Sequence, residues 1–443
     1  MAKKANRQAK KAEPGDLVRV ECGNEKHIGV LLPRPEGKQT HIAIKLGAGY
    51  NIGILEKRVT KMDVIEKSSY GVSSTLEAEE EKIGSKADGN FMSLLSCGGT
   101  IVNKIDYRTG AVYPSTSPKE LVHRFPALEK FNIRAKPLFS VASEDMSPSH
   151  WVEIAKAASS EIKHGAQGVV LAHGTDIMHY TSAALSFMLQ GLKCPVILTG
   201  SQRSSDRGSS DAKDNLHSSA IAAVSDASGV FICMHEGSSD GSCLLHFGAK
   251  VRKMHTSRRD AFRSISCLPA ARIFPSTEKF EPISPLLQPR GAGTAHTLDT
   301  RMNQNVALQY IYPGIKPEAI NALSKYDGVV LAGFGLGHIP VNLSGSPLSI
   351  SILPAAKALI SSGIPVVFAS QAIYGRVDMM VYTNQRVLLD AGIIGHLCDM
   401  TPETAYVKLM WVLGREKRME SVRALMEKNI EGKISARSEF AGY

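Results

Sequence analysis

The sequence predicts an α/β protein with two lobes and a largely parallel sheet, preceded by a small all-β barrel domain. From residue 91 onward, short apolar runs alternate with amphipathic helical segments, which is typical of a parallel sheet covered by helices. Before residue 66, short β-like runs alternate with turn-forming residues, which is typical of a small antiparallel domain. The 443 residues are enough for about two to four domains.

The first 90 residues are predicted to form three segments. Residues 1–13 are basic and nearly free of apolar side chains, so we expect a disordered arm. Residues 14–65 contain the runs LVRV, IGVLL, HIAIKL and YNIGI, and the alternation of Ile42, Ile44 and Leu46 indicates strands with one buried face. We expect a small β-barrel there. Residues 66–90 are rich in Ser, Gly and charge and are expected to be a linker.

The remaining chain is predicted to form two α/β lobes, with a large lobe over 91–285, an inter-lobe linker over 286–305 and a smaller lobe over 306–443. The expected strands carry the runs FMSLLS, GVVLAH, PVILTG, GVFICM, DGVVLAGFG and PVVFAS. Ser147 and Pro148 are a typical N-cap and first residue of a helix, which should end near Gly165. One face of that helix carries Trp151, Ile154, Ala155, Ala158 and Ile162.

Composition narrows the class of protein. No apolar run approaches the roughly 20 residues that span a bilayer, and the first residues lack a secretory signal, so we expect a cytoplasmic protein without a membrane partner. The seven cysteines show no CxxC pair, and no His, Asp or Glu cluster has metal-ligand spacing, so we expect reduced thiols and no metal. The net charge of +10 fits either a polyanionic partner or an unevenly charged enzyme.

Polar residues follow three of the predicted strands. In open parallel sheets, ligands bind beyond the carboxyl ends of the strands. Thr100 comes after Gly98 and Gly99, and glycines there allow a tight turn and a close backbone approach. Thr175 and Asp176 stand between a strand and a helix expected to start near Met178. A third turn, GSQRSSDRG, is best explained by helix capping and loop solvation, with the role of Arg203 left open.

The order of the motifs SCGGTI, SEDMSPSHW, HGTDI, GSQR and VRKMHTSRRDAF resembles that of the L-asparaginase and glutaminase-asparaginase family. The resemblance runs from about residue 91 to the C-terminus and implies an asparaginase-like fold. It implies that Thr100 is the acyl-accepting nucleophile, that Thr175, Asp176 and Lys253 activate it, and that Tyr113 lies on a flap over the site. A threonine hydroxyl needs a neighbouring base before it attacks a carbonyl, so these residue types fit that chemistry.

Other positions of the resemblance concern substrate binding. Ser143 and Glu144 match a family pair that holds the substrate carboxylate and ammonium groups, and Asp176 can share the ammonium. Cys97 and Ile177 depart from the family pattern, in which threonines are common. A rival assignment would make Cys97 the nucleophile with His173 as its base. We expect instead that Cys97 is a packing residue and that His173 bonds its own loop.

The resemblance extends to the N-terminal segments. Together with QAIYGRVDMMVYTNQRVLLDAG, the added arm and barrel make the whole chain similar to the family of archaeal glutamyl-tRNA(Gln) amidotransferase D subunits. This implies a glutaminase that deamidates glutamine or asparagine and supplies ammonia to an E subunit, which uses ATP and Mg²⁺ to convert Glu-tRNA(Gln) to Gln-tRNA(Gln). No cofactor is implied in this chain. A homodimer of the chain within an α2β2 heterotetramer is implied as well.

Two alternatives to this function stay open. One is a stand-alone cytosolic L-asparaginase or glutaminase, and the other is a nucleic-acid-binding protein whose amidase lobe is inactive. Basic charge alone supports the latter, and the joint presence of Thr100, Thr175, Asp176 and Lys253 argues against it.

Overall fold

The computed structural model describes most of the chain, with gaps. The described residues are 12–32, 40–46, 50–67, 81–83, 90–99, 101, 103–105, 112–114, 125–204, 209–293 and 295–437. Nearly all of the predicted basic arm and most of the predicted linker over 66–90 lie outside these ranges.

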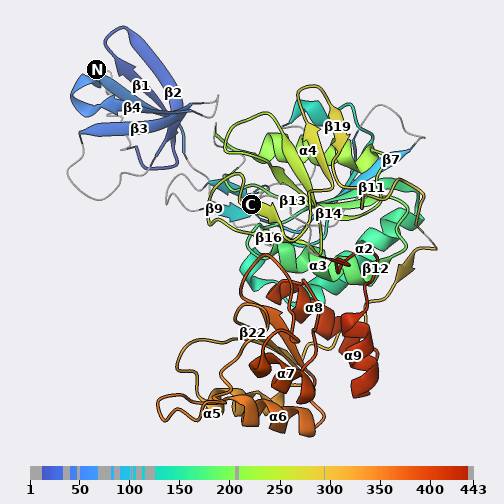
Figure 1. The fold of residues 1–443 in the computed structure, drawn as a ribbon. Helices are drawn as coiled ribbons and strands as arrows, with labels where there is room; N and C mark the ends of the chain where they lie inside the picture. Colours follow the sequence, from blue (N-terminus) through green and yellow to red (C-terminus); the bar gives the residue numbers. More distant parts are fainter. Residues whose placement is uncertain are drawn as a thin grey trace, which may run out of the picture.

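The N-terminal segment folds into a five-stranded antiparallel sheet with its own core (Figure 1). Its strands are β1 (Leu17–Cys22), β2 (Glu25–Leu31), β3 (His41–Leu46), β4 (Asn51–Leu55) and β5 (Lys61–Glu66), in the order β4-β3-β2-β1-β5. The predicted alternation is present, because Ile42 and Ile44 are buried with Val18 and Val20. The strand β5 is not among the predicted runs, since charged residues interrupt its apolar positions. A single 3-10 turn, η1 (Glu56–Arg58), precedes it.

The large lobe is built on a nine-stranded sheet whose centre is parallel. Strands β10, β7, β11, β13 and β14 run parallel, and antiparallel strands flank them on both sides. This confirms the predicted fold class. The strands, in spatial order, are β19 (Lys279–Pro282), β18 (Ala271–Phe274), β15 (Cys243–Phe247), β14 (Gly229–His235), β13 (Pro195–Thr199), β11 (Ala166–Ala172), β7 (Phe91–Ser96), β10 (Ile133–Pro137) and β6 (Glu81–Ile83). Strand β6 lies within the stretch predicted as a linker.

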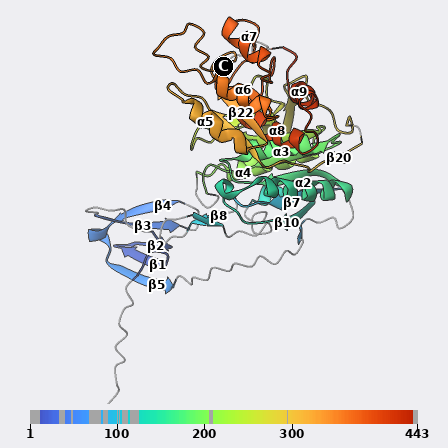
Figure 2. The ribbon, with the colours of Figure 1, turned by 90° about the horizontal axis from the view of Figure 1, so that it is seen from below.

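Helices cover both faces of this sheet (Figures 1 and 2). On one face, α2 (Pro148–Lys163) and α3 (Met178–Met188) bury Trp151 and Leu185. On the other, α4 (Ala212–Val224) buries Leu216. Helix α2 has the predicted start and end, because Ser147 and the His150 side chain form a capping box and Gly165 follows with φ of +91°.

The smaller lobe has a three-stranded parallel sheet, and one of its helices packs against the large lobe. Its strands are β21 (Val306–Tyr310), β22 (Gly328–Gly333) and β23 (Val366–Ser370), and its helices are α5 (Pro317–Asn321), α6 (Leu353–Ser361), α7 (Thr383–Asp390), α8 (Pro402–Leu413) and α9 (Met419–Glu427). Helix α8 packs against both α3 and β22 (Figure 1). One apolar cluster therefore contains Phe187 of α3, Trp411 of α8 and Val330 of β22.

Short elements complete the described fold. Three two-stranded ladders pair β8 (Asn103–Ile105) with β9 (Val112–Pro114), β16 (Val251–Lys253) with β17 (Phe262–Ser264), and β12 (Leu189–Gln190) with β20 (Thr297–Leu298). Strand β20 lies inside the predicted inter-lobe linker. Single 3-10 turns are η3 (Pro126–Leu128), η4 (Ser143–Asp145) and η5 (Ala322–Lys325). In the described ranges, no helix has the length and apolar character needed to cross a membrane.

Candidate active site

The amino group of Lys253 binds both polar side chains that follow β11. Its Nζ donates to Thr175 Oγ1 at 2.8 Å and to Asp176 Oδ1 at 2.6 Å. The Thr175 residue is buried, the Lys253 side chain is 9% exposed, and the Asp176 side chain is 65% exposed. The cluster thus has a shielded cation and hydroxyl and one carboxylate that is open to a ligand.

Two strand ends bring these residues together. Thr175 and Asp176 lie between the end of β11 and the start of α3 at Met178, as the sequence predicted for this helix. Lys253 is the last residue of β16 and pairs with Phe262 of β17.

Three loops approach one another closely around His173 and Gly174. A Cβ atom at Gly99, whose φ is +90°, would lie 2.3 Å from the backbone nitrogen of Gly174. A Cβ atom at Gly174 would lie 2.6 Å from Cβ of Ser143, and one at Gly200 would lie 2.5 Å from the carbonyl oxygen of His173. Only glycine fits such approaches, so the loops after β7, β11 and β13 converge where the sequence predicted a site.

Two predicted residues cannot be placed. Thr100 lies outside the described residues, between Gly99 and Ile101. For Tyr113 the structure gives only the backbone, which pairs with Lys104 in the β8-β9 ladder. Their assigned roles remain predictions.

The predicted substrate-binding pair lies in η4, beside the loop that carries Thr175. Ser143 is buried against Gly174, and its hydroxyl donates to Oε2 of the exposed Glu144 at 3.4 Å. A hydroxyl and a carboxylate are therefore available near Thr175, which fits the binding of a polar, charged substrate.

The contacts of Cys97 and His173 do not favour the rival nucleophile and base. Burial raises the pKa of the Cys97 thiol well above its ordinary value and lowers the pKa of His173 to about 4. Nδ1 of His173 lies 2.6 Å from the carbonyl oxygen of Gly174, so it is the protonated nitrogen, and Nε2 accepts from Thr181 Oγ1 at 3.0 Å. Both ring nitrogens of His173 are thus engaged in holding the loop.

A buried ion pair next to Lys253 is a feature that the sequence reasoning missed. Arg252 binds Oε1 of Glu403 through Nε at 2.9 Å and Nη2 at 2.8 Å. Glu403 belongs to the first turn of α8, so the smaller lobe holds the strand that carries Lys253. No local sequence signal links these two positions.

The turn after β13 is held by the carboxylate of Asp211. It accepts hydrogen bonds from the backbone nitrogens of Gln202 and Arg203. The Arg203 guanidinium donates to Ser209 Oγ at 2.8 Å, so it stays within the turn. These contacts stabilise the turn itself, whereas the side chain of Asp211, the N-cap residue of α4, makes no capping hydrogen bond to that helix.

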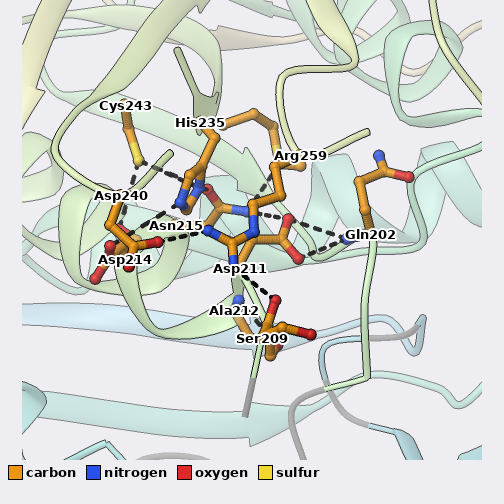
Figure 3. A network of polar contacts seen from close by, with 12 residues as sticks. Gln202, Ser209, Asp211, Ala212, Asp214, Asn215, His235, Asp240, Cys243 and Arg259 are labelled. Carbon is orange, nitrogen blue, oxygen red and sulfur yellow. Dashed lines mark hydrogen bonds and ion pairs between the residues drawn. The ribbon is translucent and has the colours of Figure 1, made fainter. Parts of the chain in front are cut away.

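One group in the described part of the chain has the geometry of metal ligands. It consists of Asp214, His235 and Asp240, which come from three different elements (Figure 3). Sequence spacing could not reveal it, because the fold alone brings these residues together.

Sequence and structure comparisons agree on one family. Residues 92–283 match the asparaginase N-terminal family, residues 305–426 the glutaminase/asparaginase C-terminal domain, and residues 12–65 the GatD N-terminal domain. The chain is 44% identical, over 96% of its length and 95% of the relative, to the glutamyl-tRNA(Gln) amidotransferase D subunit from Pyrococcus furiosus. It is 43% identical, with the same coverage, to the D subunit from Methanothermobacter thermautotrophicus.

Among solved structures, the thermostable L-asparaginase from Thermococcus kodakarensis superposes with a TM-score of 0.70 and 30% identity. The match covers 78% of this chain and 99% of the asparaginase.

Proposed function

This chain belongs to the asparaginase family, within the glutamyl-tRNA(Gln) amidotransferase D subunits, and we propose that it is the amide-donor glutaminase of such an enzyme. The observation that carries the proposal is the contact of Lys253 Nζ with both Thr175 Oγ1 and Asp176 Oδ1. This cluster lies beside the loop Gly98–Gly99 that leads to Thr100, and a shielded amine next to a hydroxyl can relay a proton from an attacking threonine.

The proposed reaction has two steps. The Thr100 hydroxyl attacks the carboxamide carbon of glutamine or asparagine, and its proton passes through Thr175 and Lys253 to the departing nitrogen, which leaves as ammonia. Water then hydrolyses the acyl ester, which releases the acid and restores Thr100. Backbone N–H groups near Gly99 and Thr175 stabilise the negative oxygen of each tetrahedral intermediate.

The substrate is held by its charged groups. Asp176 and Glu144 face the ammonium group, and the Ser143 hydroxyl donates to the carboxylate. The exposure of both carboxylates supports this role. Tyr113, on the β8-β9 ladder, covers the bound amide.

The partner and setting are part of the same proposal. The ammonia goes to an E subunit, which uses ATP and Mg²⁺ to amidate Glu-tRNA(Gln). Two copies of each subunit form the complex, which binds tRNA(Gln) in the cytoplasm of an archaeon.

A stand-alone asparaginase is the second candidate, because the Thermococcus kodakarensis L-asparaginase matches 78% of the chain. The relatives named as D subunits match 96%, including the N-terminal sheet, which favours the first candidate. An inactive amidase lobe is disfavoured, since a binding module has no need of the Lys253 cluster.

Ammonia release from glutamine and asparagine tests the proposal. We expect release by the purified chain to rise when the E subunit and Glu-tRNA(Gln) are added, and Thr100→Ala to abolish release in every condition. Full activity alone that is indifferent to partner and tRNA would support the stand-alone enzyme. Unchanged release by Thr100→Ala would refute the assigned nucleophile.

A further inference from the structure

Three side chains of metal-ligand type meet at the end of β14, one strand beyond β13 in the large sheet. Asp214 belongs to the first turn of α4, His235 ends β14, and Asp240 lies in the loop between β14 and β15 (Figure 3). One ligand atom from each lies within 4.8 Å of the other two. None of them contacts the Lys253 cluster through the described hydrogen bonds and ion pairs, so this group is separate from the amidase site.

The hydrogen bonds around Asn215 fix which nitrogen of His235 carries a proton. Nδ2 of Asn215 donates to the carbonyl oxygen of Gly200 and to Asp211 Oδ2, both at 2.9 Å, so Oδ1 is the acceptor end of that amide. Oδ1 lies 2.6 Å from His235 Nδ1, which must therefore be an N–H donor. The other ring nitrogen, Nε2, is therefore the one that can bind a metal ion.

The imidazole of His235 is buried, and its Nε2 lies near the carboxylates of Asp214 and Asp240. The His235 side chain is only 1% exposed, and Nε2 makes no hydrogen bond to any described residue. Its nearest carboxylate oxygen, Asp214 Oδ2, is 4.0 Å away, which is too long for a hydrogen bond. A buried imidazole acceptor beside carboxylates is unfavourable unless a proton or a metal cation lies between them, and a metal ion can also bind Asp240, whose other contact is Arg259.

We propose that Asp214, His235 and Asp240 bind one divalent transition-metal ion of the Zn²⁺ class. An imidazole nitrogen and two carboxylate oxygens are a donor set that such ions accept, at about 2.0–2.2 Å from each ligand. A separation of 4.0 Å between two donors is about twice that bond length, so a small approach of the carboxylates completes the site. The Asp240 side chain is 78% exposed, which leaves room for this movement and for water ligands.

The surroundings resemble the outer contacts of a metal site. A ligating histidine almost always donates its other N–H to a fixed acceptor, as His235 does to Asn215. Arg259 binds Asp240 Oδ1 at 2.5 Å and donates to the carbonyl oxygen of Ser209 at 2.8 Å, so it orients the exposed ligand. The ion would tie α4, β14 and the β14-β15 loop together.

Zinc titration of the full-length chain tests the proposal. After chelator treatment, Zn²⁺ binding is measured by calorimetry for the wild type, for Asp240→Asn and for the control Asp390→Asn, which changes an exposed carboxylate of the smaller lobe. We expect Asp240→Asn to weaken the binding of one ion per chain by at least about tenfold, and the control to bind as the wild type does. Asp240 is exposed, so this variant should fold.

A second variant tests the histidine. His235→Gln should lose the same ion, and Co²⁺ bound to the wild type should show a visible absorption band that both ligand variants lack. Equal Zn²⁺ binding by the wild type, Asp240→Asn and Asp390→Asn would overturn the proposal. So would the absence of a bound ion, in which case the group is a protonated His235 paired with Asp214.

Discussion

Lys253 contacts two side chains of the proposed amidase site, and its removal should affect the chemical step more than substrate binding. We expect Lys253→Met to lower kcat for ammonia release by about 10²–10⁴-fold, the usual contribution of a positioned proton-transfer group, with a smaller change in KM. Steady-state kinetics with glutamine measures both constants. The exposed Lys316, changed to Met, is the control. A change confined to KM would contradict the proton-transfer role.

His173 should make the stability of the large lobe depend on pH. Its pKa is about 4 in the folded protein, because it is buried and uncharged there, whereas an unfolded histidine titrates near pH 6.5. Protons therefore bind the unfolded chain preferentially, and the stabilisation present above pH 6.5 is lost as the pH falls toward 4.

The variant His173→Gln removes this titration. Between pH 7 and pH 5 its free energy of unfolding should fall by about 2 kcal/mol less than that of the wild type, as measured by urea unfolding. Equal losses in the two proteins would show that His173 is charged in the folded state.

At the scale of elements, the contact between β16 and α8 links the strand that carries Lys253 to the smaller lobe. The Glu403 side chain is 4% exposed and that of Arg252 is 25% exposed, so loss of one partner leaves a poorly solvated charge. We expect Glu403→Gln to destabilise the protein by about 1–3 kcal/mol. It should also lower kcat, because Lys253 is the next residue after Arg252.

Thermal unfolding and kinetics measure these two effects of Glu403→Gln. The matched control is Glu153→Gln, which breaks the exposed pair with Lys156 on α2 and should cost less than about 1 kcal/mol. If both variants behaved alike, the β16-α8 contact would have no special role.

At the scale of the whole molecule, the N-terminal sheet is separate from the amidase core. Its apolar cluster contains residues of β1 to β5 and shares no residue with the three apolar clusters of the two lobes. We expect a chain lacking residues 1–66 to keep the wild-type rate of ammonia release when assayed alone, within about twofold. Stimulation by the E subunit and Glu-tRNA(Gln) should be lost if the sheet serves the complex. Unaltered stimulation would assign the sheet another role.

The parts of the fold that depend on local signals could be predicted from the sequence. Strands β7, β11 and β13 are mostly apolar and largely buried, and α2 has a clear cap and a periodic face. Strands β5, β6 and β20 could not be predicted, since they are short or carry charges and exist only because a neighbouring strand pairs with them.

The residues of the candidate site divide in the same way, into those with a local sequence signal and those without one. The polar residues at the end of β11 were found from strand order, whereas Lys253, 77 residues away from Asp176, was found only from the resemblance of its motif to a family. Arg252 with Glu403, and Asp214 with His235 and Asp240, depend on tertiary contacts that leave no periodic or spaced signal.

The self-contained core of the N-terminal sheet has an evolutionary consequence. Because its buried residues contact one another, a gene fusion could have added this segment to an ancestral amidase without compensating substitutions in the two lobes. The match of the Thermococcus kodakarensis L-asparaginase over 99% of its own length, but 78% of this chain, fits such an acquisition. Selection could then have adapted the added surface to new partners while the hydrolytic machinery stayed unchanged.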